Sequence, residues 1–330
     1  MRQEGRLLVI VNHAAARARR AWPRVRAYLE EEWIRFDAHE SVGPGETEGR
    51  TREALAGGYS AVAVVGGDGT LSAAAAGYFE PCADLSAGER PRAVNPSAAL
   101  AVLPAGTGDD FARGLAGGRR EPLEAWLARL VEHCRAERMG AARSVDVLLG
   151  SADGGARRFV CLNAATLGIG AEVAGRVAAQ GARLRRMSGE LRFAWAAVQS
   201  LVAWRNRRVR LLVDGVEWAE CRTNLIAVVN GTYAGGGMNF SPEASLTDGL
   251  LDVLTVCGLS RAGLVRELTR VHRGGHLANP KVRLARGTSV RVETADPADS
   301  LGVEADGDVR GRTPAEFRVL PAALRVVWHT

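Results

Sequence analysis

The sequence contains almost no lysine. Of its 43 basic residues only Lys281 is a lysine, and arginine supplies the rest. A Walker A loop needs a lysine that reaches the bound phosphates, and a Schiff base forms on a lysine amine, so neither chemistry is expected. If the protein binds phosphate groups, backbone amides, arginine side chains or a metal ion must neutralise their charge.

Long apolar runs and paired cysteines are also missing. The longest run, Phe193–Trp204, has about half of the ~20 residues that cross a bilayer and contains Gln199 and Ser200. The short run Leu7–Val11 predicts a first strand and not a signal peptide. Five scattered cysteines without a CxxC pair predict neither a disulfide framework nor a zinc site. A cytoplasmic protein is therefore the expectation.

The remaining composition is that of an ordinary globular protein, with 47% hydrophobic and 24% charged residues. Its 330 residues are enough for two domains. The net charge of +6 and the isoelectric point near 9.5 favour anionic partners. Nucleic acid, lipid surfaces and phosphorylated ligands all meet that description, and the sign of the charge does not choose among them.

Residues 1–142 alternate apolar strand patterns with helical patterns, which predicts an α/β domain with a mainly parallel sheet. Strands are expected at Arg6–Asn12, Arg35–Ser41, Ala61–Val65 and Leu100–Leu103, and helices at Ala15–Trp33, Glu46–Ala56, Leu71–Ala76 and Glu121–Arg138.

Residues 143–330 change to short strands bounded by turns, which predicts a β-rich second domain. Strands are expected at Ser144–Leu149, Arg158–Leu162, Val209–Val213, Leu225–Val229, Leu250–Val256, Ser289–Glu293, Glu316–Leu320 and Leu324–Trp328. Two helical segments, Ala171–Trp204 and Arg261–Val271, interrupt them.

Two glycine-rich turns follow strands of the first domain, where an α/β sheet binds its ligands. Consecutive glycines let backbone N–H groups converge on an anion, and the helix that follows adds its positive end. In Gly66-Gly67-Asp68-Gly69-Thr70, Asp68 either holds a metal-bound water or takes a proton, or it caps the next helix. In the second turn, Leu103–Arg113, Thr107 can donate to a phosphate and Asp109 can be a plain N-cap.

The motifs together resemble the diacylglycerol kinase catalytic-domain family, which includes bacterial soluble lipid kinases, sphingosine kinases and ceramide kinases. The resemblance runs from Leu8 to about Val327. Besides the two glycine turns it is carried by Asn163 with Leu167-Gly168, by Val229-Asn230 with Gly235-Gly236-Gly237, by Pro242 with Asp248-Gly249-Leu250-Leu251-Asp252-Val253, and by Asp306-Gly307-Asp308.

This resemblance implies a nucleotide-binding α/β domain, a C-terminal β-sandwich-like domain and an active site in the cleft between them. It implies transfer of phosphate from ATP, with Mg²⁺, to a lipid hydroxyl, with diacylglycerol ahead of sphingoid bases. On matching positions the ATP contacts are Asn12, Ser41, Gly66, Gly67, Asp68, Gly69, Thr70, Leu71, Ser72 and Thr107. The Asp248 carboxylate and the carbonyls of Ser245 and Leu250 would hold a structural magnesium, linked towards Asp146.

The catalytic positions that the resemblance implies are Asp68 and Asp308, and Asp308 stands where the family has a glutamate. The simpler alternative for Asp306-Gly307-Asp308 is a hairpin turn with two solvated aspartates, and Asp248-Gly249 could likewise be a plain turn. Other departures from the family pattern are Ala14 and His13 after the first strand, Ser72-Ala73 in place of Asn-Glu, and Asp109 in place of Asn.

The segment from Arg176 to Arg210 has nine arginines, one acid (Glu190) and interleaved apolar residues. A solvated helical face over a core stripe is the commoner outcome, but a lipid substrate favours an interfacial helix that holds the protein peripherally at a membrane.

Rival functions are an NAD kinase-like enzyme and a non-catalytic nucleotide or lipid sensor. Nucleic acid is not expected as a partner, because no binding motif accompanies the basic run. The sequence does not decide between a monomer and a homo-oligomer.

Overall fold

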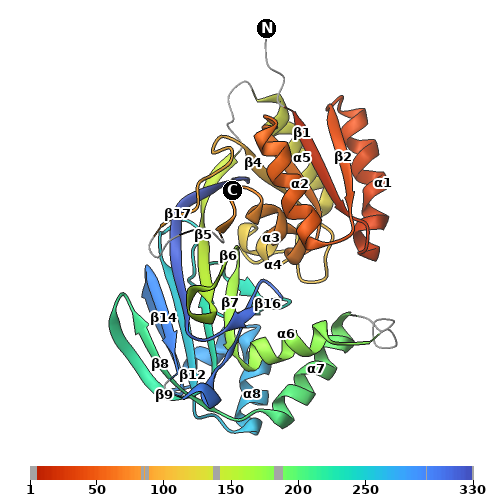
Figure 1. The fold of residues 1–330 in the computed structure, drawn as a ribbon. Helices are drawn as coiled ribbons and strands as arrows, with labels where there is room; N and C mark the ends of the chain where they lie inside the picture. The colour runs from red at the N-terminus through yellow and green to blue at the C-terminus, as the bar shows by residue number, and fades with distance from the viewer. Residues whose placement is uncertain are drawn as a thin grey trace. The chain divides into compact units, whose positions relative to one another are not determined.

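The computed structural model describes residues 6–82, 85, 89–136, 142–181, 189–294 and 296–328. The chain forms two compact units, residues 1–147 with 320–330, and residues 148–319 (Figure 1). The predicted boundary after residue 142 therefore lies slightly before the observed one, and the last residues of the chain return to the first unit.

The first unit contains a parallel sheet, as predicted. Strand β1 pairs in parallel with β2 and β3, and β3 pairs in parallel with β4. The strands are β1 (Leu7–Asn12), β2 (Phe36–Ser41), β3 (Ala61–Gly66) and β4 (Ala99–Pro104). Strands β1, β3 and β4 are apolar and buried along almost their whole length, because helices cover both faces of such a sheet.

The helices of this unit follow the strands in the predicted order. They are α1 (Ala16–Glu31), α2 (Pro44–Ala56), α3 (Asp68–Ala76), α4 (Asp110–Leu115) and α5 (Leu123–Arg135). Helix α1 buries Ala18, Trp22, Val25 and Leu29, whose spacing places them on one side of the helix. Helix α1 contacts α5, and α2 contacts α3.

The second unit is a β-sandwich-like domain of antiparallel strands (Figure 1). Its long strand β9 pairs with β8, β7 and β12, and its second half is almost completely buried. The strands are β6 (Arg157–Cys161), β7 (Ala164–Gly168), β8 (Arg207–Val213), β9 (Val216–Val229), β10 (Tyr233–Ala234), β11 (Met238–Asn239), β12 (Leu251–Cys257), β13 (Val282–Gly287), β14 (Ser289–Glu293), β15 (Gly302–Ala305) and β16 (Asp308–Arg312).

Two strands, β5 (Ala142–Ala152) and β17 (Ala315–Val327), have residues in both units. The prediction of two separate strands, Glu316–Leu320 and Leu324–Trp328, was wrong, because β17 is continuous. It passes through Ala322 with a φ of 50°, and the Ala322 N–H donates to Oδ1 of Asp146 at 2.8 Å. The buried Asp146 carboxylate thus supports the irregular point of the strand.

The helices of the second unit differ in part from the prediction. In place of one segment Ala171–Trp204 there are α6 (Ile169–Ala178) and α7 (Gly189–Ala203), and residues 182–188 between them lie outside the described ranges. Helix α8 (Arg261–Val271) is present as predicted, and at its start the Ser260 side chain accepts a hydrogen bond from the Gly263 N–H. No helix among the described residues is long and apolar enough to cross a membrane.

A disulfide joins Cys221 of β9 to Cys257 at the end of β12. The sequence prediction that no disulfide is present was wrong at this pair. The two cysteines are 36 residues apart in the chain, and only the antiparallel pairing of β9 with β12 brings them together.

Candidate active site

The two glycine-rich turns of the first unit touch each other. A Cβ on Gly106 would lie 2.5 Å from Cα of Gly67, and a Cβ on Gly67 would lie 3.0 Å from Cα of Gly106. The Ala105 N–H donates to the Gly66 carbonyl at 2.9 Å. Glycine is therefore needed at both positions for a close backbone approach, and the turns form one structure at the carboxyl ends of β3 and β4.

Asp68 links these turns to helix α4. It is the first residue of α3, and its Oδ1 accepts from the Phe111 N–H in the first turn of α4 at 3.0 Å. The alternative in which Asp68 caps a helix is met at a different helix, because Asp68 caps α4 and not α3, which follows its own turn. The first turn of α3 keeps N–H groups that no intrahelical bond uses, which suits an anion.

Asp109 closes the second turn but does not cap α4 with its side chain. It adopts a left-handed conformation with a φ of 49°, which aspartate tolerates, and its Oδ1 accepts from the Gly106 N–H at 2.8 Å. Burial raises the pKa of the Asp109 carboxyl above its ordinary value; the bond from Gly106 opposes this, and the negative charge of Asp68 adds to it.

Asn12 at the end of β1 is joined to the first turn. Its Nδ2 donates to Oγ1 of Thr70 at 2.7 Å, and its Oδ1 accepts from the Ala14 N–H at 3.1 Å. A hydroxyl that accepts a hydrogen bond can still donate its own proton, so Thr70 remains a donor for a ligand oxygen. The structure thus brings together Asn12, Thr70 and the glycines that the sequence singled out.

Other predicted nucleotide contacts lie in different settings. Leu71 and Ser72 are buried in α3, and Thr107 is exposed on the second turn. The Ser41 hydroxyl is buried at the β2–α2 connection, where it bonds to the Gly43 carbonyl at 3.0 Å and to Thr47 Oγ1 at 2.6 Å. Ser41 therefore fixes that connection and does not point its hydroxyl into solvent.

Two arginines that sequence reasoning missed bind the second turn. Arg17 of α1 donates to the Gly106 carbonyl at 2.8 Å, and Arg120 donates to the carbonyls of Thr107 at 2.9 Å and Gly108 at 3.2 Å. They place positive charge beside the turns in a protein that has no lysine there. No motif marks either residue, because arginine is common throughout the chain.

In the second unit the Asp306-Gly307-Asp308 turn connects β15 to β16. The Asp306 carboxylate accepts N–H bonds from Leu162 at 2.7 Å, Asn163 at 3.0 Å and Ala164 at 3.3 Å. Asp306 is therefore not the solvated aspartate of the simpler alternative. It holds the turn against the connection between β6 and β7.

Asp308 is the more accessible member of this turn. Its side chain is about half exposed at 49%, and Oδ2 lies 3.4 Å from Nη2 of Arg310. An accessible carboxylate beside one arginine can approach a ligand without first breaking a buried network. The structure is compatible in this respect with the predicted role.

Glu304 is a titratable group in this region that the sequence prediction did not select. Its carboxylate accepts from Thr166 Oγ1 and from the Gly307 N–H, both at 2.5 Å. Burial raises the pKa of Glu304 to about 7, and the charges of Asp306 and Asp308 add to the rise, while these two hydrogen bonds oppose it. Glu304 thus titrates near neutral pH beside the turn that carries Asp308.

The predicted magnesium ligands lie in one turn of the second unit. Asp248 Oδ1 accepts from the Leu250 N–H at 3.1 Å, and Ser245 Oγ accepts from the Thr247 N–H at 3.3 Å. Within the described ranges no group of three His, Cys, Asp or Glu side chains could hold a metal. One exposed carboxylate and two main-chain carbonyls are nevertheless oxygen donors of the kind that suits Mg²⁺, which keeps several waters.

A network of hydrogen bonds around the buried Ser241 and Asp252 supports this turn from its two ends. Asp252 accepts from Ser241 Oγ at 2.5 Å and from Arg286 Nε at 2.7 Å, and Arg286 also donates to the Glu243 carbonyl at 2.8 Å. The chain before and after residues 245–250 is thereby fixed.

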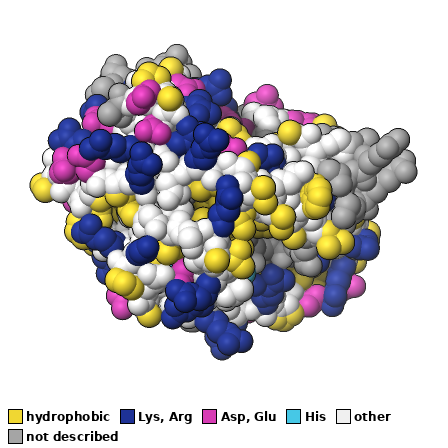
Figure 2. Space-filling view, turned by 90° about the horizontal axis from the view of Figure 1, so that it is seen from below, with side chains coloured by type: hydrophobic (Ala, Val, Ile, Leu, Met, Phe, Trp, Pro, Cys, Tyr) yellow, Lys and Arg dark blue, Asp and Glu magenta, His cyan; other side chains and the backbone are white. Residues whose placement is uncertain are grey.

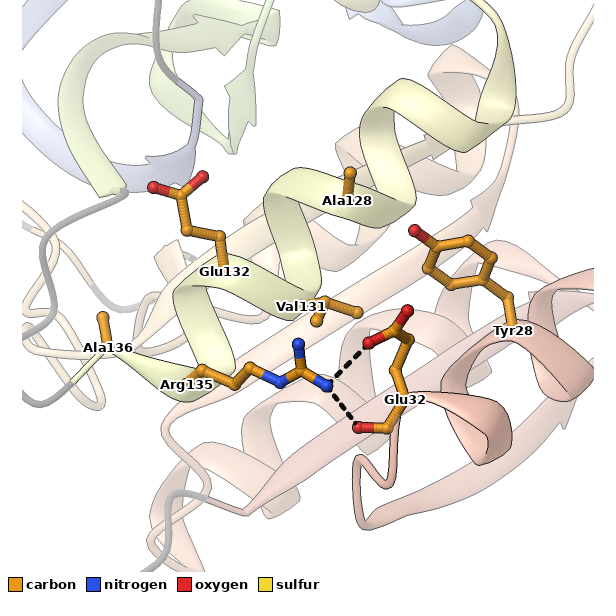
Figure 3. Close-up of a pocket in the computed structure, with 7 residues that line it drawn as sticks. All are labelled: Tyr28, Glu32, Ala128, Val131, Glu132, Arg135 and Ala136. Atoms are coloured by element: carbon orange, nitrogen blue, oxygen red, sulfur yellow. Dashed lines mark hydrogen bonds and ion pairs between the residues drawn. The ribbon is translucent and has the colours of Figure 1, made fainter.

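A separate hollow lies between α1 and α5 of the first unit (Figure 3). Arg135 closes one side of it by donating to the Glu32 carbonyl at 2.9 Å and to Glu32 Oε2 at 2.6 Å. The residues that line it are Tyr28, Glu32, Ala128, Val131, Glu132, Arg135 and Ala136, and none of them is a predicted site residue.

Comparison with known proteins gives a consistent assignment. Residues 6–147 match the model for the diacylglycerol kinase catalytic domain, and residues 165–328 match the YegS C-terminal NAD kinase beta sandwich-like domain. A diacylglycerol kinase from Mycobacterium tuberculosis is 31% identical over 277 residues, which cover 83% of this chain and 78% of that protein. A protein named probable lipid kinase YegS-like from Xanthomonas oryzae is 32% identical over 301 residues, or 90% of this chain and 88% of that one.

The fold is also that of a solved protein from Bacillus anthracis, described as a diacylglycerol kinase. The TM-score is 0.66 and the sequence identity is 17%, with 99% of this chain and 97% of that chain covered. The chain therefore belongs to the family of diacylglycerol kinases and YegS-like lipid kinases, and it is a lipid kinase.

Proposed function

We propose that the protein transfers the γ-phosphate of ATP to the hydroxyl of diacylglycerol and forms phosphatidic acid. The observation that carries the nucleotide half of this proposal is the backbone contact between Gly67 and Gly106, which joins two phosphate-type turns into one cradle. Asn12 and Thr70 add side-chain hydrogen-bonding groups, and Arg17 and Arg120 add positive charge.

In the proposed reaction the lipid hydroxyl oxygen forms a bond to the γ-phosphorus, and the bond to the oxygen bridging the β- and γ-phosphates breaks. ADP is the leaving group. The proton of the hydroxyl passes to a carboxylate, which we propose to be Asp308, and then to water. Asp68 accepts from the Phe111 N–H and so holds α4 in place, and we propose it as the second catalytic carboxylate.

The residues proposed to hold magnesium are Asp248 through its carboxylate and Ser245 and Leu250 through their carbonyls. When bound, this structural Mg²⁺ would draw the oxygen ligands of the turn together and keep waters in its shell. Asp252 and Arg286, which fix the chain on either side of these ligands, would limit their movement.

The experiment that tests this function is a transfer assay with radiolabelled ATP. The purified protein is offered diacylglycerol, sphingosine and a total lipid extract, each dispersed in detergent, and the labelled product is identified by chromatography. Labelled phosphatidic acid is expected, and it should vanish in the Asp308→Asn variant.

Two other results would replace this proposal. Label in a sphingoid base or another lipid would keep the kinase activity and change the substrate. Binding of ATP with no labelled lipid from any source would favour the non-catalytic sensor, for which the aspartate in place of the family's glutamate is the specific observation.

A further inference from the structure

Helix α7 leaves large apolar side chains in solvent. Trp195 is 50% exposed, Val198 is 55% exposed and Val202 is 63% exposed. Their spacing of three and four residues places them in one row along the helix, here called the α7 stripe. Leu191, at 57% exposure and four residues before Trp195, extends this row towards the beginning of the helix.

The fully buried positions of α7 hold small residues. Ala196 and Ser200 are buried, at 0% and 1% exposure, and α7 contacts α6. Gln180, which follows α6, donates to the Arg192 carbonyl at 2.9 Å and accepts from Arg192 Nε at 2.8 Å. The orientation of α7 is therefore fixed, and the α7 stripe is its outer side.

This arrangement is the reverse of the commoner outcome for a basic amphipathic run. In that outcome the large apolar residues would form the core stripe and the polar residues would be solvated. Here the fully buried positions of the helix are small residues, and Trp195, Val198 and Val202 are exposed. An exposed apolar row of this kind marks an interaction site.

The charged residues that follow the α7 stripe in the sequence are arginines. From Leu191 to Arg210 there is no acidic residue, and Arg205, just after α7, is exposed, whereas the exposed Arg208 is paired with Glu220 of β9 at 2.6 Å. Figure 2, viewed from below Figure 1, shows hydrophobic side chains next to Lys and Arg side chains on the surface. The partner that fits is apolar inside and anionic at its edge.

We propose that the α7 stripe inserts into the interfacial region of an anionic lipid bilayer, with the neighbouring arginines on the headgroups. Tryptophan is well suited to that depth, because its ring is apolar and its N–H is polar. This rests on the proposed function in one respect, since diacylglycerol lies in a bilayer. A second copy of the chain fits less well, because a two-fold contact through the α7 stripe would bring the arginines of both copies into one interface.

The test measures vesicle binding without ATP or substrate. The whole protein is sedimented with vesicles of phosphatidylcholine alone and with vesicles that also contain phosphatidylglycerol. Binding should be stronger on the anionic vesicles and should weaken as salt is raised. Replacing Trp195, Val198 and Val202 together by Gln should weaken it by at least ~10-fold, because the apolar area no longer leaves water. Arg205→Gln should weaken it by about 5-fold.

Matched controls separate insertion from unfolding. Val216 in the second unit is 71% exposed, so Val216→Gln is the control for Val202→Gln, and the exposed Arg20 of α1 gives Arg20→Gln as the control for Arg205→Gln. The controls should bind like the wild type. All variants should keep wild-type rates on detergent-dispersed substrate, which also confirms folding.

Three results would overturn the proposal. The triple variant could bind anionic vesicles as well as the wild type, the control variants could lose as much binding, or the wild type could fail to bind and instead form a dimer that the triple variant dissolves. Vesicle binding without kinase activity would support membrane insertion of the α7 stripe and contradict phosphorylation of diacylglycerol. The two proposals can therefore fail separately.

Discussion

Substitution of Asp68 separates its role in holding α4 from its role in chemistry. In the structure Asp68 Oδ1 accepts from the Phe111 N–H at 3.0 Å. Asparagine has an oxygen at the same place and can keep this bond, whereas alanine removes it. Asp68→Asn therefore changes the charge alone, and Asp68→Ala changes both the charge and the cap.

The two variants should therefore lose different amounts of stability. Loss of a helix-capping acceptor costs about 1 kcal/mol of the free energy of unfolding, and more when the donor is left buried, so Asp68→Ala should lose ~1–3 kcal/mol. Asp68→Asn should lose clearly less. If the charge serves proton or metal-water chemistry, turnover should fall by about 10² or more in both variants.

The assays are urea unfolding for stability and labelled-phosphate transfer for turnover. Near-normal turnover in a folded Asp68→Asn variant would refute the catalytic role and leave Asp68 as the cap of α4. Equal losses of the free energy of unfolding in both variants would contradict the hydrogen bond from the Phe111 N–H to Asp68 Oδ1. A further check is Asp109, whose pKa is raised in part by the charge of Asp68 and should therefore fall in Asp68→Asn.

Three further predictions follow from the two turns and from the β15–β16 hairpin. Asp308→Asn should abolish transfer while ATP binding measured by calorimetry stays, and Asp308→Glu should keep measurable activity; normal turnover in Asp308→Asn would move the base elsewhere. Because the folded-state pKa of Glu304 is raised from 4.5 to about 7, the folded state holds this proton more tightly than the unfolded chain, so stability should fall as pH rises from 4.5 to about 7. Glu304→Gln should remove this fall of the free energy of unfolding with pH. If urea unfolding of the variant shows the same dependence on pH as the wild type, Glu304 is not the group that titrates. Gly106→Ala would place a Cβ 2.5 Å from Gly67 Cα, so it should weaken ATP binding more than Gly114→Ala, whose Cβ would meet nothing within 4 Å.

Much of the first unit follows from local sequence. The strands β1, β3 and β4 are continuous apolar runs, and such runs are predictable because a parallel sheet buries both faces. The glycine turns were equally visible, since glycine at a strand end followed by a helix is a local pattern.

In the second unit local signals were weaker, and some predictions failed for that reason. Strand β7, with the sequence Ala-Ala-Thr-Leu-Gly, was missed because small residues carry little strand preference, although its position between β9 and β15 buries it fully. Strand β17 was divided at Pro321-Ala322, because proline and a turn-like step normally end a strand, whereas the bond from Ala322 to Asp146 lets it continue.

The sequence by itself determined that the chain has an α/β part with a phosphate-type cradle, a β-rich part and a basic amphipathic segment. Only the tertiary structure decided which partners each group meets. The Cys221–Cys257 disulfide, the anchoring of Asp306 by three backbone amides and the raised pKa of Glu304 all depend on segments far apart in the chain. The same holds for α7, because periodicity shows that a helix has two faces, but packing against α6 decides which of them is left to the solvent.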